Sequence, residues 1–311
     1  MSIEERVEVG RILSVLGDDR VQLQAGPASR FLEKKTWSPA HASTMENLWV
    51  RVPDTIVLLG SPPQDAEGQR RERLEERRPT NCAREVPGFY ISRYHVTNDL
   101  FQAFIQDGYD RHDCWNWSSS SWQWHQSHPL PEQSNQTRIG NAPCRMVSWY
   151  EAVAFCRWLS MINPFHLEVF LPAESQWLAA ACSDPEGTFH NTVHVWGDTF
   201  EEPLAKLSGY GNIRRLKLNT ICSVGIFQPN RLGIFDMTGN VAEWTRSMWR
   251  SDLALPEKND LENLPKTQRT FRGCSYRDLD ADIRVGRRRG LPPEQRSPFV
   301  GFRIAARVRN Q

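Results

Sequence analysis

From residue 86 to the end of the chain, short apolar stretches alternate with turn residues, and this pattern leaves room for few long elements. Three segments carry helix signals. Residues 97–108 (TNDLFQAFIQDG) begin with a Thr N-cap and end at Gly, residues 148–162 (SWYEAVAFCRWLSMI) begin with a Ser–Glu capping box, and residues 174–182 (ESQWLAAAC) form a shorter helix. Residues 183–311 are rich in turns and short strands, without a repeat of fixed period. The sequence therefore predicts an α+β fold with much irregular structure.

The N-terminal part of the chain has a different pattern. Residues 3–17 place apolar residues among charges at helical spacing, which predicts a short amphipathic helix. Residues 18–50 mix Pro, Ser and Lys without periodicity, as a linker does. We therefore expect a helix and linker over residues 1–50 and a single domain over residues 51–311.

Charge and composition exclude several classes of protein. The formal net charge of the 311 residues is +1, so no overall field favours nucleic acid or a membrane surface. The N-terminus does not resemble a secretory signal, and no window approaches the roughly 18 consecutive apolar residues of a membrane span. The seven cysteines are scattered and form no CxxC pair, which is typical of reduced thiols. We expect a soluble cytoplasmic protein without a nucleic-acid or membrane partner.

Two local patterns could be read as ligand sites. His190 and His194 have the spacing of a helical metal pair, but Gly, Thr and Val around them favour a loop or strand, so we do not expect a transition-metal site. The stretch 115–124 (WNWSSSSWQW) alternates Trp with polar residues, which in a strand would place the indoles in pairs on shared faces. Those faces could be an aromatic platform for a ligand or part of the core, and the sequence leaves both interpretations open.

Several segments, in this order, resemble the formylglycine-generating enzyme family, also called the sulfatase-modifying factor domain. They span residues 50–306 and include 89-FYISRYHVTNDLFQAF-104, 146-MVSWYEAVAFCRWLS-160, 223-SVGIFQPNRLGIFDMTGNVAEW-244 and 300-VGFRIA-305. The run from GIFDMTGN to VAEW is highly specific. The resemblance implies a variant of the C-type lectin fold with little regular secondary structure, in agreement with the predicted α+β class.

The resemblance also implies which metal chemistry is lost. The family's aerobic enzyme binds copper through two cysteines five residues apart, shortly after a Gly-Gly-Ser. Counting from Ser275, those two positions hold Asp278 and Ile283, and isoleucine offers no ligand to copper(I). The related iron-dependent sulfoxide synthases take their ligands from a histidine-bearing helical bundle, whereas the residues before this domain contain one histidine, His41. We therefore expect neither copper nor iron.

Two further departures fall in the family's pocket region. The usual Asn-Val-Trp-Glu-Trp has Ala242 in place of its first tryptophan, and the second glycine of Gly-Gly-Ser is Cys274. The arginines around Cys274 could lower its pKa, or the side chain could be a small core filler. An alternative function is therefore a metal-dependent oxidoreductase with an altered metal centre, for which Cys274 and Asp278 are the best candidate ligands.

A calcium site is the part of the family's chemistry that the sequence retains. In the family, the segment matching residues 236–243 (DMTGNVAE) wraps a calcium ion, and the residues at the ligand positions are Asp236, Gly239, Val241 and Glu243. Two carboxylates and backbone carbonyls from a tight Gly-Asn turn suit a hard cation with oxygen ligands. The resemblance therefore predicts a bound Ca²⁺.

The C-terminal stretch 271–290 (FRGCSYRDLDADIRVGRRRG) is dense in charge. Arg284, Arg288, Arg296 and Arg303 fall on the family's C-terminal pattern, so we expect them to be structural and to bind backbone carbonyls. The residues left without such a role are Tyr276, Arg277, Asp278, Leu279, Asp280, Asp282, Arg287, Arg289, Leu291, Ser297, Pro298 and Phe299. In a third branch, the variable proteins of diversity-generating retroelements, this is the surface that changes while the lectin-type frame stays constant.

These observations lead to one functional prediction. The chain is expected to be a catalytically inert binding protein whose C-terminal face, residues 274–299, recognises a protein or other macromolecule. The residues predicted to contact it are Tyr276, Arg277, Asp278, Asp280, Asp282, Arg287, Arg289, Ser297 and Phe299. Tyr, Arg and Asp on a rigid scaffold suit such a face. Family context also suggests that the N-terminal helix docks onto a partner protein.

Overall fold

The computed structural model describes residues 5–9, 12, 48–66, 68, 70, 82–129, 131–132, 139–163, 167–198, 211–261 and 267–309. The helices labelled within them are α4 (Asn98–Asp107), α5 (His112–Trp115), α6 (Ser119–Ser127), α7 (Trp149–Ile162) and α8 (Glu174–Cys182). The strands are β1 (Trp49–Val52), β2 (Thr55–Leu59), β3 (Cys82–Val86), β4 (Phe89–Ser92), β5 (Leu167–Phe170), β6 (Ala242–Met248), β7 (Arg269–Arg272), β8 (Arg288–Leu291), β9 (Val300–Gly301) and β10 (Ala305–Val308). This mixture of helices and short strands confirms the predicted α+β class. None of the described helices is long and apolar enough to cross a membrane.

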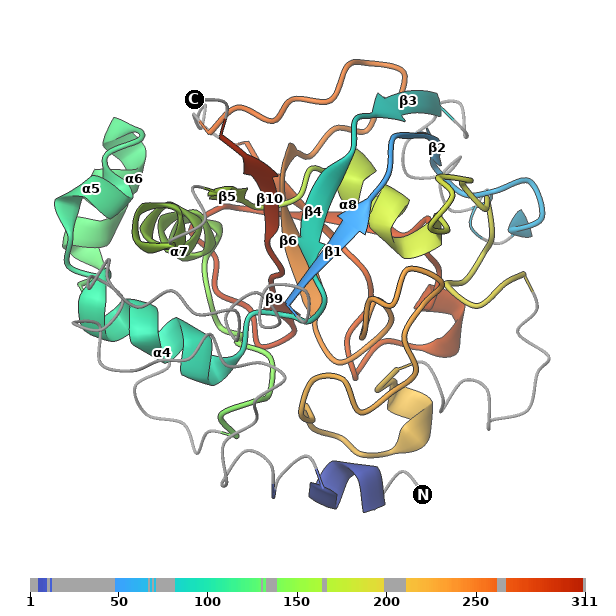
Figure 1. Cartoon of the computed structure of the whole chain (residues 1–311), viewed down its shortest axis with the longest axis horizontal. Helices are drawn as coiled ribbons and strands as arrows, with labels where there is room; N and C mark the ends of the chain where they lie inside the picture. The colour runs from blue at the N-terminus through green and yellow to red at the C-terminus, as the bar shows by residue number, and fades with distance from the viewer. Residues whose placement is uncertain are drawn as a thin grey trace.

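Two small sheets join distant parts of the chain. The first has the order β1-β4-β10-β5, so that Ala305 near the C-terminus pairs with both Ile91 and Phe170. The second has the order β8-β7-β6-β9, and β6 runs parallel to β9. Figure 1 shows α4 to α7 on one side of the central strands and α8 on the other. The last segments of the chain thus complete the core that the first segments begin.

The predicted helices are confirmed together with their caps. The Thr97 hydroxyl accepts a hydrogen bond from the N–H of Leu100 at 3.3 Å and begins α4. Ser148 and Glu151 form the capping box of α7, with the Glu151 carboxylate accepting from the Ser148 N–H at 2.8 Å. Helix α8 spans residues 174–182 as predicted. Of the predicted N-terminal helix, residues 5–9 and 12 are helical, and its other residues lie outside those described.

The tryptophan-rich stretch, residues 115–124, consists of helical and turn structure, so its indoles are not arranged as they would be in a strand. Ser118 and Ser121 form a capping box that begins α6, and this serine cap converts the apparent alternation into a turn and a helix. Trp115 is fully buried and stacks on His125, with the ring centroids 4.3 Å apart. Trp124 is also buried. Both indoles belong to the main hydrophobic core, which supports the core interpretation of this stretch.

The HxxxH pair lies outside the described helices, and its two rings have different neighbours. His190 Nε2 lies 2.8 Å from Asp184 Oδ2. His194 is buried and stacks on Trp196, with the ring centroids 4.7 Å apart. The segment does not hold these two imidazoles on one helical face, in line with the loop or strand expected there.

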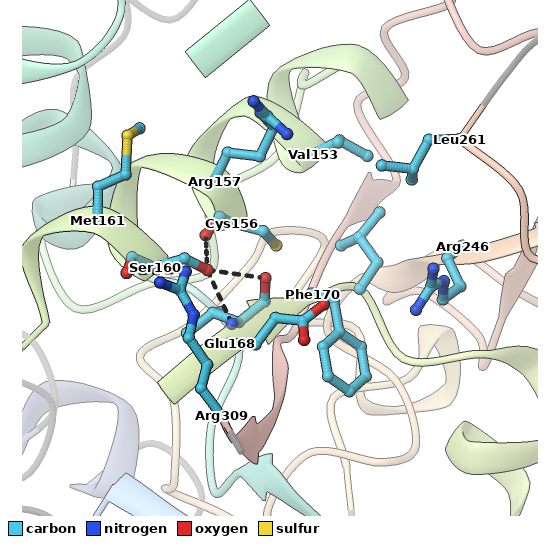
Figure 2. A pocket seen from close by; sticks show the side chains of 12 residues that line it. Val153, Cys156, Arg157, Ser160, Met161, Glu168, Phe170, Arg246, Leu261 and Arg309 are labelled. Atoms are coloured by element: carbon cyan, nitrogen blue, oxygen red, sulfur yellow. Dashed lines mark hydrogen bonds between the residues drawn. The ribbon is translucent and has the colours of Figure 1, made fainter. Parts of the chain in front are cut away.

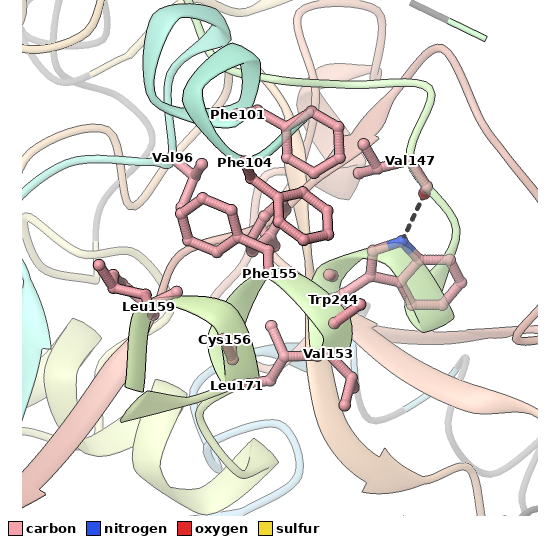
Figure 3. Close-up of a cluster of buried hydrophobic side chains, with 14 of the residues drawn as sticks. Val96, Phe101, Phe104, Val147, Val153, Phe155, Cys156, Leu159, Leu171 and Trp244 are labelled. Atoms are coloured by element: carbon pink, nitrogen blue, oxygen red, sulfur yellow. Dashed lines mark hydrogen bonds between the residues drawn. The ribbon is translucent and has the colours of Figure 1, made fainter. Parts of the chain in front are cut away.

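The main core is built around α7 (Figure 3). Phe155 lies in van der Waals contact with aromatic rings from two other segments, with centroid distances of 5.8 Å to Phe104 and 5.3 Å to Phe302. Trp244 of β6 completes this layer, and its indole N–H donates to the Val147 carbonyl at 3.0 Å. The rings interdigitate edge to face, a geometry that aromatic pairs favour.

Replacing Phe155 with alanine should therefore remove the centre of this layer. We expect F155A to lower the free energy of unfolding by about 3–5 kcal/mol, because it leaves a cavity among rings that cannot close over it. Urea denaturation measures this loss. Met161 lies on the same helix and is 40% exposed, so M161A should change the free energy by no more than about 0.5 kcal/mol. Equal effects of the two substitutions would contradict this account of the core.

Candidate functional site

Asp278 organises the loop between β7 and β8. Its Oδ2 accepts hydrogen bonds from the backbone N–H and the hydroxyl of Ser275 at 2.6 and 2.9 Å. Its Oδ1 accepts from Arg287 at 3.0 Å and from Arg289 at 3.1 Å. Arg287 also lies 3.2 Å from Asp282 Oδ1. We call Asp278, Asp282, Arg287 and Arg289 the Asp278 network.

The charges of this network stabilise the loop from within. Burial alone would raise the pKa of Asp278, but Arg289 and Arg287 beside it hold that pKa below its usual range. The carboxylate therefore stays ionised and links the segment at Ser275 to the segment that contains Arg287 and Arg289. Arg289 also lies over the Phe271 ring, 4.7 Å from its centroid. Four of the side chains predicted to contact a ligand are thus occupied in holding the face together.

Another group of side chains on this face reaches solvent. Leu279 is 54% exposed. Arg277 is exposed, and its guanidinium lies 6.0 Å from the centroid of Phe299. Tyr276 is only 8% exposed and packs against the same Phe299 ring, with the centroids 6.0 Å apart. The buried Tyr276 thus supports a surface formed by Arg277, Leu279 and Phe299.

The remaining predicted contact residues lie at the border of this surface. Asp280 forms an ion pair with Arg215 at 3.2 Å, and both side chains are 41% exposed. Ser297 is half-buried, and its hydroxyl accepts from the N–H of Phe299 at 3.3 Å. No local sequence pattern connects Arg215 with Asp280, because Arg215 lies 65 positions earlier in the chain.

The positions of the family's copper-binding cysteines contain no soft ligand. Ile283 is 1% exposed and packs in a small cluster with Cys274 and Ile213. The Cys274 sulfur accepts from the N–H of Gly239 at 3.2 Å, and burial raises the pKa of this thiol to about 12. The thiol is therefore neutral at physiological pH, and the interpretation of Cys274 as a core filler fits the structure. Asp278, the other candidate ligand, is held in its network.

The four arginines of the C-terminal pattern are structural, but their main partners are carboxylates rather than the expected carbonyls. The pairs are Arg284 with Asp65 at 3.0 Å, Arg288 with Glu174 at 2.7 Å, Arg296 with Glu151 at 2.7 Å and Arg303 with Glu243 at 2.7 Å. Carbonyls take the remaining donors, as Ser92 does at 3.1 Å from Arg303. The reason is that a buried guanidinium charge is costly unless an opposite charge lies beside it.

The segment predicted to hold calcium is a tight turn that leads into β6. Asp236 and Gly239 have φ values of 58° and 79°, and a Cβ on Gly239 would lie 2.2 Å from the Asn212 carbonyl oxygen. Asp236 is buried, and its Oδ2 accepts from the N–H of Gly225 at 2.8 Å. Its Oδ1 is buried and has no hydrogen-bond partner among the described residues. This oxygen fits the role of a cation ligand.

Glu243 does not present a free oxygen to a cation. Its Oε1 lies 2.9 Å from His95 Nε2 and accepts from Arg303 Nη2 at 2.9 Å. Its Oε2 accepts from Arg303 Nε and Trp177 Nε1, both at 2.7 Å. Three hydrogen bonds and the nearby His95 ring thus occupy both oxygens of this carboxylate. Burial alone would raise the pKa of Glu243, but Arg303 and His95 lower it to about 2. The calcium site stays a prediction, with Asp236 as its best-placed ligand.

Comparison with known proteins identifies the family. The family model of the sulfatase-modifying factor enzyme 1-like domain, or FGE-sulfatase, matches residues 40–308. The chain belongs to this family. Among FGE-sulfatase relatives it is 29% identical over 252 residues to the hercynine oxygenase of Mycobacterium tuberculosis, a match that covers 75% of this chain and 55% of that relative. It is 30% identical over 175 residues to the inactive C-alpha-formylglycine-generating enzyme 2 of Mus musculus, which covers 53% of this chain and 49% of the relative.

The chain spans about half the length of these two relatives, with matches that cover 55% and 49% of them. The structure of Treponema denticola variable protein 1 superposes with a TM-score of 0.54 at 21% identity, covering 83% of this chain and 94% of that chain. At this identity the likeness shows the fold alone. It confirms the predicted C-type lectin-like architecture of the FGE-sulfatase domain.

The buried ion pairs of the domain make its stability depend on pH. Glu174 Oε1 lies 2.7 Å from Arg288 and 3.0 Å from Arg272. Burial alone would raise the pKa of Glu174, but Arg288 and Arg272 hold it below its usual range. A lowered folded-state pKa stabilises the protein above the unfolded-state pKa of about 4.3 and loses that contribution as the pH falls through the folded-state value.

We expect E174Q to lower the free energy of unfolding by about 3–5 kcal/mol at neutral pH, because it leaves two buried guanidinium groups without their anion. The difference from the wild type should shrink as the pH falls below about 4.3. Denaturant titrations at several pH values measure both effects. The matched control is E168Q, which removes an exposed pair with Arg307 and should cost at most about 1 kcal/mol. A pH-independent difference would contradict the assignment.

Proposed function

We propose that the chain is a catalytically inert binding protein of the FGE-sulfatase family, and that residues 274–299 form the face that recognises a macromolecular ligand. One observation carries the proposal. The positions that hold copper ligands in the family's aerobic enzyme are occupied by Asp278, paired with Arg287 and Arg289, and by the buried Ile283. At the positions where the family's aerobic enzyme binds copper, this chain therefore has residues that support the loop of the 274–299 face.

The composition of that surface suits recognition. Arg277, Leu279 and Phe299 combine a planar donor group, an exposed aliphatic side chain and an aromatic ring. Interfaces concentrate their binding energy in such residues when the surrounding frame is rigid, since little conformational entropy is then lost. Treponema denticola variable protein 1 has the same fold. The resemblance of the sequence to the variable proteins implies a ligand-binding face in this region. That likeness supports a binding role here.

The alternative enzymatic function is less well supported. An altered metal centre would rely on Cys274 and Asp278. Cys274 is buried with a raised pKa, and both oxygens of Asp278 already accept hydrogen bonds. A thiolate is the form of cysteine that binds metals and attacks substrates, so this thiol is poorly suited to either role. The name of the inactive relative in Mus musculus agrees with a loss of catalysis in the family.

Two accessory parts belong to this proposal. A calcium ion would be held by Asp236 Oδ1 and the carbonyls of Gly239 and Val241, and it would stabilise the turn before β6. The N-terminal helix would dock onto a partner protein. Arg6 ties this helix to the domain through a 3.4 Å hydrogen bond to the Ile226 carbonyl, while Val9 and Ile12 are 41% and 48% exposed. The cytoplasmic location of the protein stays a prediction.

The binding face can be tested by photo-crosslinking in the native host. A photoreactive phenylalanine analogue at Leu279 should give a discrete adduct with a macromolecule, whereas the same analogue at Ile56 should not. Leu279 and Ile56 are matched in exposure, at 54% and 57%. Adding R277A should lower the adduct yield at Leu279 by about tenfold, the effect of losing one significant interface contact. Equal adducts at both positions, or none at Leu279, would refute the proposed face.

Metal analysis by mass spectrometry tests the second part of the proposal. Protein purified without a tag and dialysed without chelator should contain about one calcium per chain and substoichiometric copper and iron. D236N should lose the calcium, and the control D252N, at a half-buried aspartate in another loop, should keep it. Stoichiometric copper or iron would overturn the inert assignment. A calcium-free wild type would remove the calcium site and leave the binding face to the crosslinking result.

A further inference from the structure

A cavity of about 290 Å³ lies between α7, β5 and β6, and it shares no residue with the 274–299 face. Figure 2 shows its lining, in which the apolar residues Val153, Phe170 and Leu261 are interspersed with Arg157, Arg246 and Arg309. A volume of this size falls near the lower limit of pockets that hold small molecules. The cavity is too small for a folded segment of another protein.

Arg246 is the distinctive residue of this cavity. Its Nε donates to the Asn259 carbonyl at 3.2 Å, and its guanidinium lies 5.4 Å from the centroid of Phe170. No carboxylate among the described residues lies within ion-pair distance of it. Burial and the neighbouring Arg307 lower the pKa of Arg246, and the more distant carboxylates of Glu168 and Glu257 offset this lowering only in part. By contrast, Arg288, Arg296 and Arg303 each pair with a carboxylate.

The other polar groups of the cavity do not supply the missing anion. The Glu168 carboxylate is paired with Arg307 at 2.8 Å. The Ser160 hydroxyl donates to the Cys156 carbonyl at 2.8 Å and accepts from the N–H of Val169 at 2.8 Å. The groups that remain are cationic.

Arg157 adds a second incompletely satisfied guanidinium. Its Nη2 donates to the Asp113 carbonyl at 2.9 Å and to Asn116 Oδ1 at 2.8 Å. Its Nε is buried and has no hydrogen-bond partner among the described residues. A native protein rarely leaves a buried donor unpaired, and an unfilled donor beside a cavity is a common sign of a missing ligand or ion.

We propose that this cavity binds a small organic anion, namely a carboxylate carried on an apolar body, and that Arg246 is its principal charged partner. The guanidinium fork matches a carboxylate in two-point geometry. Val153, Phe170, Leu171 and Leu261 would enclose the apolar part. Both halves of the ligand are needed, because the lining combines cationic donors with hydrocarbon side chains. This site is additional to the proposed binding face and does not depend on it.

Isothermal titration calorimetry with 4-phenylbutyrate tests the proposal on the full chain. The acid should bind one site with a Kd at or below about 1 mM. The neutral analogue 4-phenylbutan-1-ol and the small anion acetate should each bind at least about tenfold more weakly, since each lacks one half of the recognised structure. Equal binding of the alcohol would show an apolar cavity without anion recognition, and absence of binding by the acid would overturn the proposal outright.

Variants place the binding in the cavity. R246Q should raise the Kd for 4-phenylbutyrate at least about tenfold. The control R51Q changes an exposed arginine on β1, the strand at the opposite edge of the sheet from β5, and should leave the Kd unchanged. L261W keeps every charge but narrows the cavity, so it should also weaken binding. It serves as the test of the site if R246Q does not fold. Unchanged affinity in folded R246Q or L261W would refute the site.

One further variant tests whether the anion in the cavity is a free ligand or a carboxylate of the chain itself. Glu262 follows Leu261 in the sequence and lies outside the described residues. E262Q should bind 4-phenylbutyrate as the wild type does. A gain in affinity of tenfold or more in E262Q would show that this side chain competes for the cavity, and it would overturn the assignment of a small-molecule site.

Discussion

The buried pair of Glu243 and Arg303 is the interaction on which the rest of the domain depends. The side chains are at most 1% exposed and lie 2.7 Å apart, and they join β6 to the segment that leads into β10. Trp177 of α8 and His95 contact the same carboxylate, so one anion connects β6 to α8 and to the segment between β4 and α4. Losing either member would leave a charge in the interior without a partner, which costs far more than an exposed pair contributes.

The same principle explains the arginine-rich C-terminus. A domain with short strands and long irregular segments has few continuous backbone ladders, so its loops must be held by side chains. Glu174, Glu151 and Asp65 each receive an arginine from the last part of the chain. The charges therefore cancel inside the fold. The C-terminal arginines that look like a basic patch in the sequence mostly form ion pairs inside the fold, and few of them contribute charge to the surface.

In this arrangement, the residues that hold the loop in place are different from those that are exposed to solvent. In the 274–299 region the Asp278 network holds the loop, while Arg277 and Leu279 reach solvent above it. Side chains at the displayed positions can change without breaking an ion pair, which is the property that a recognition surface requires. The cavity beside Arg246 follows the opposite rule. There a guanidinium lies within the fold without a carboxylate among the described residues, so the missing anion is the feature that requires an explanation.

Local patterns in the sequence determined the helices, their caps and the family. Thr97, Ser148 and Glu151 predicted helix starts correctly because capping depends on residues three or four positions apart. The loss of the copper cysteines at Asp278 and Ile283 was also visible in the sequence, since it needs only a motif and a spacing. In contrast, the period-two tryptophans of residues 115–124 were compatible with a strand, but the serine cap between them begins a helix.

Only the tertiary structure decided which charges face one another. Arg303 and Glu243 are 60 positions apart, and Arg288 and Glu174 are 114 positions apart, so no local pattern could pair them. From the sequence, Arg287, Arg289 and Asp278 were candidates for ligand contact, whereas in the folded chain they pair with one another. The carboxylate-free surroundings of Arg246 were equally invisible, because they depend on what lies near it in space. Pairing energies act over a few ångströms, and only the folded chain determines those distances.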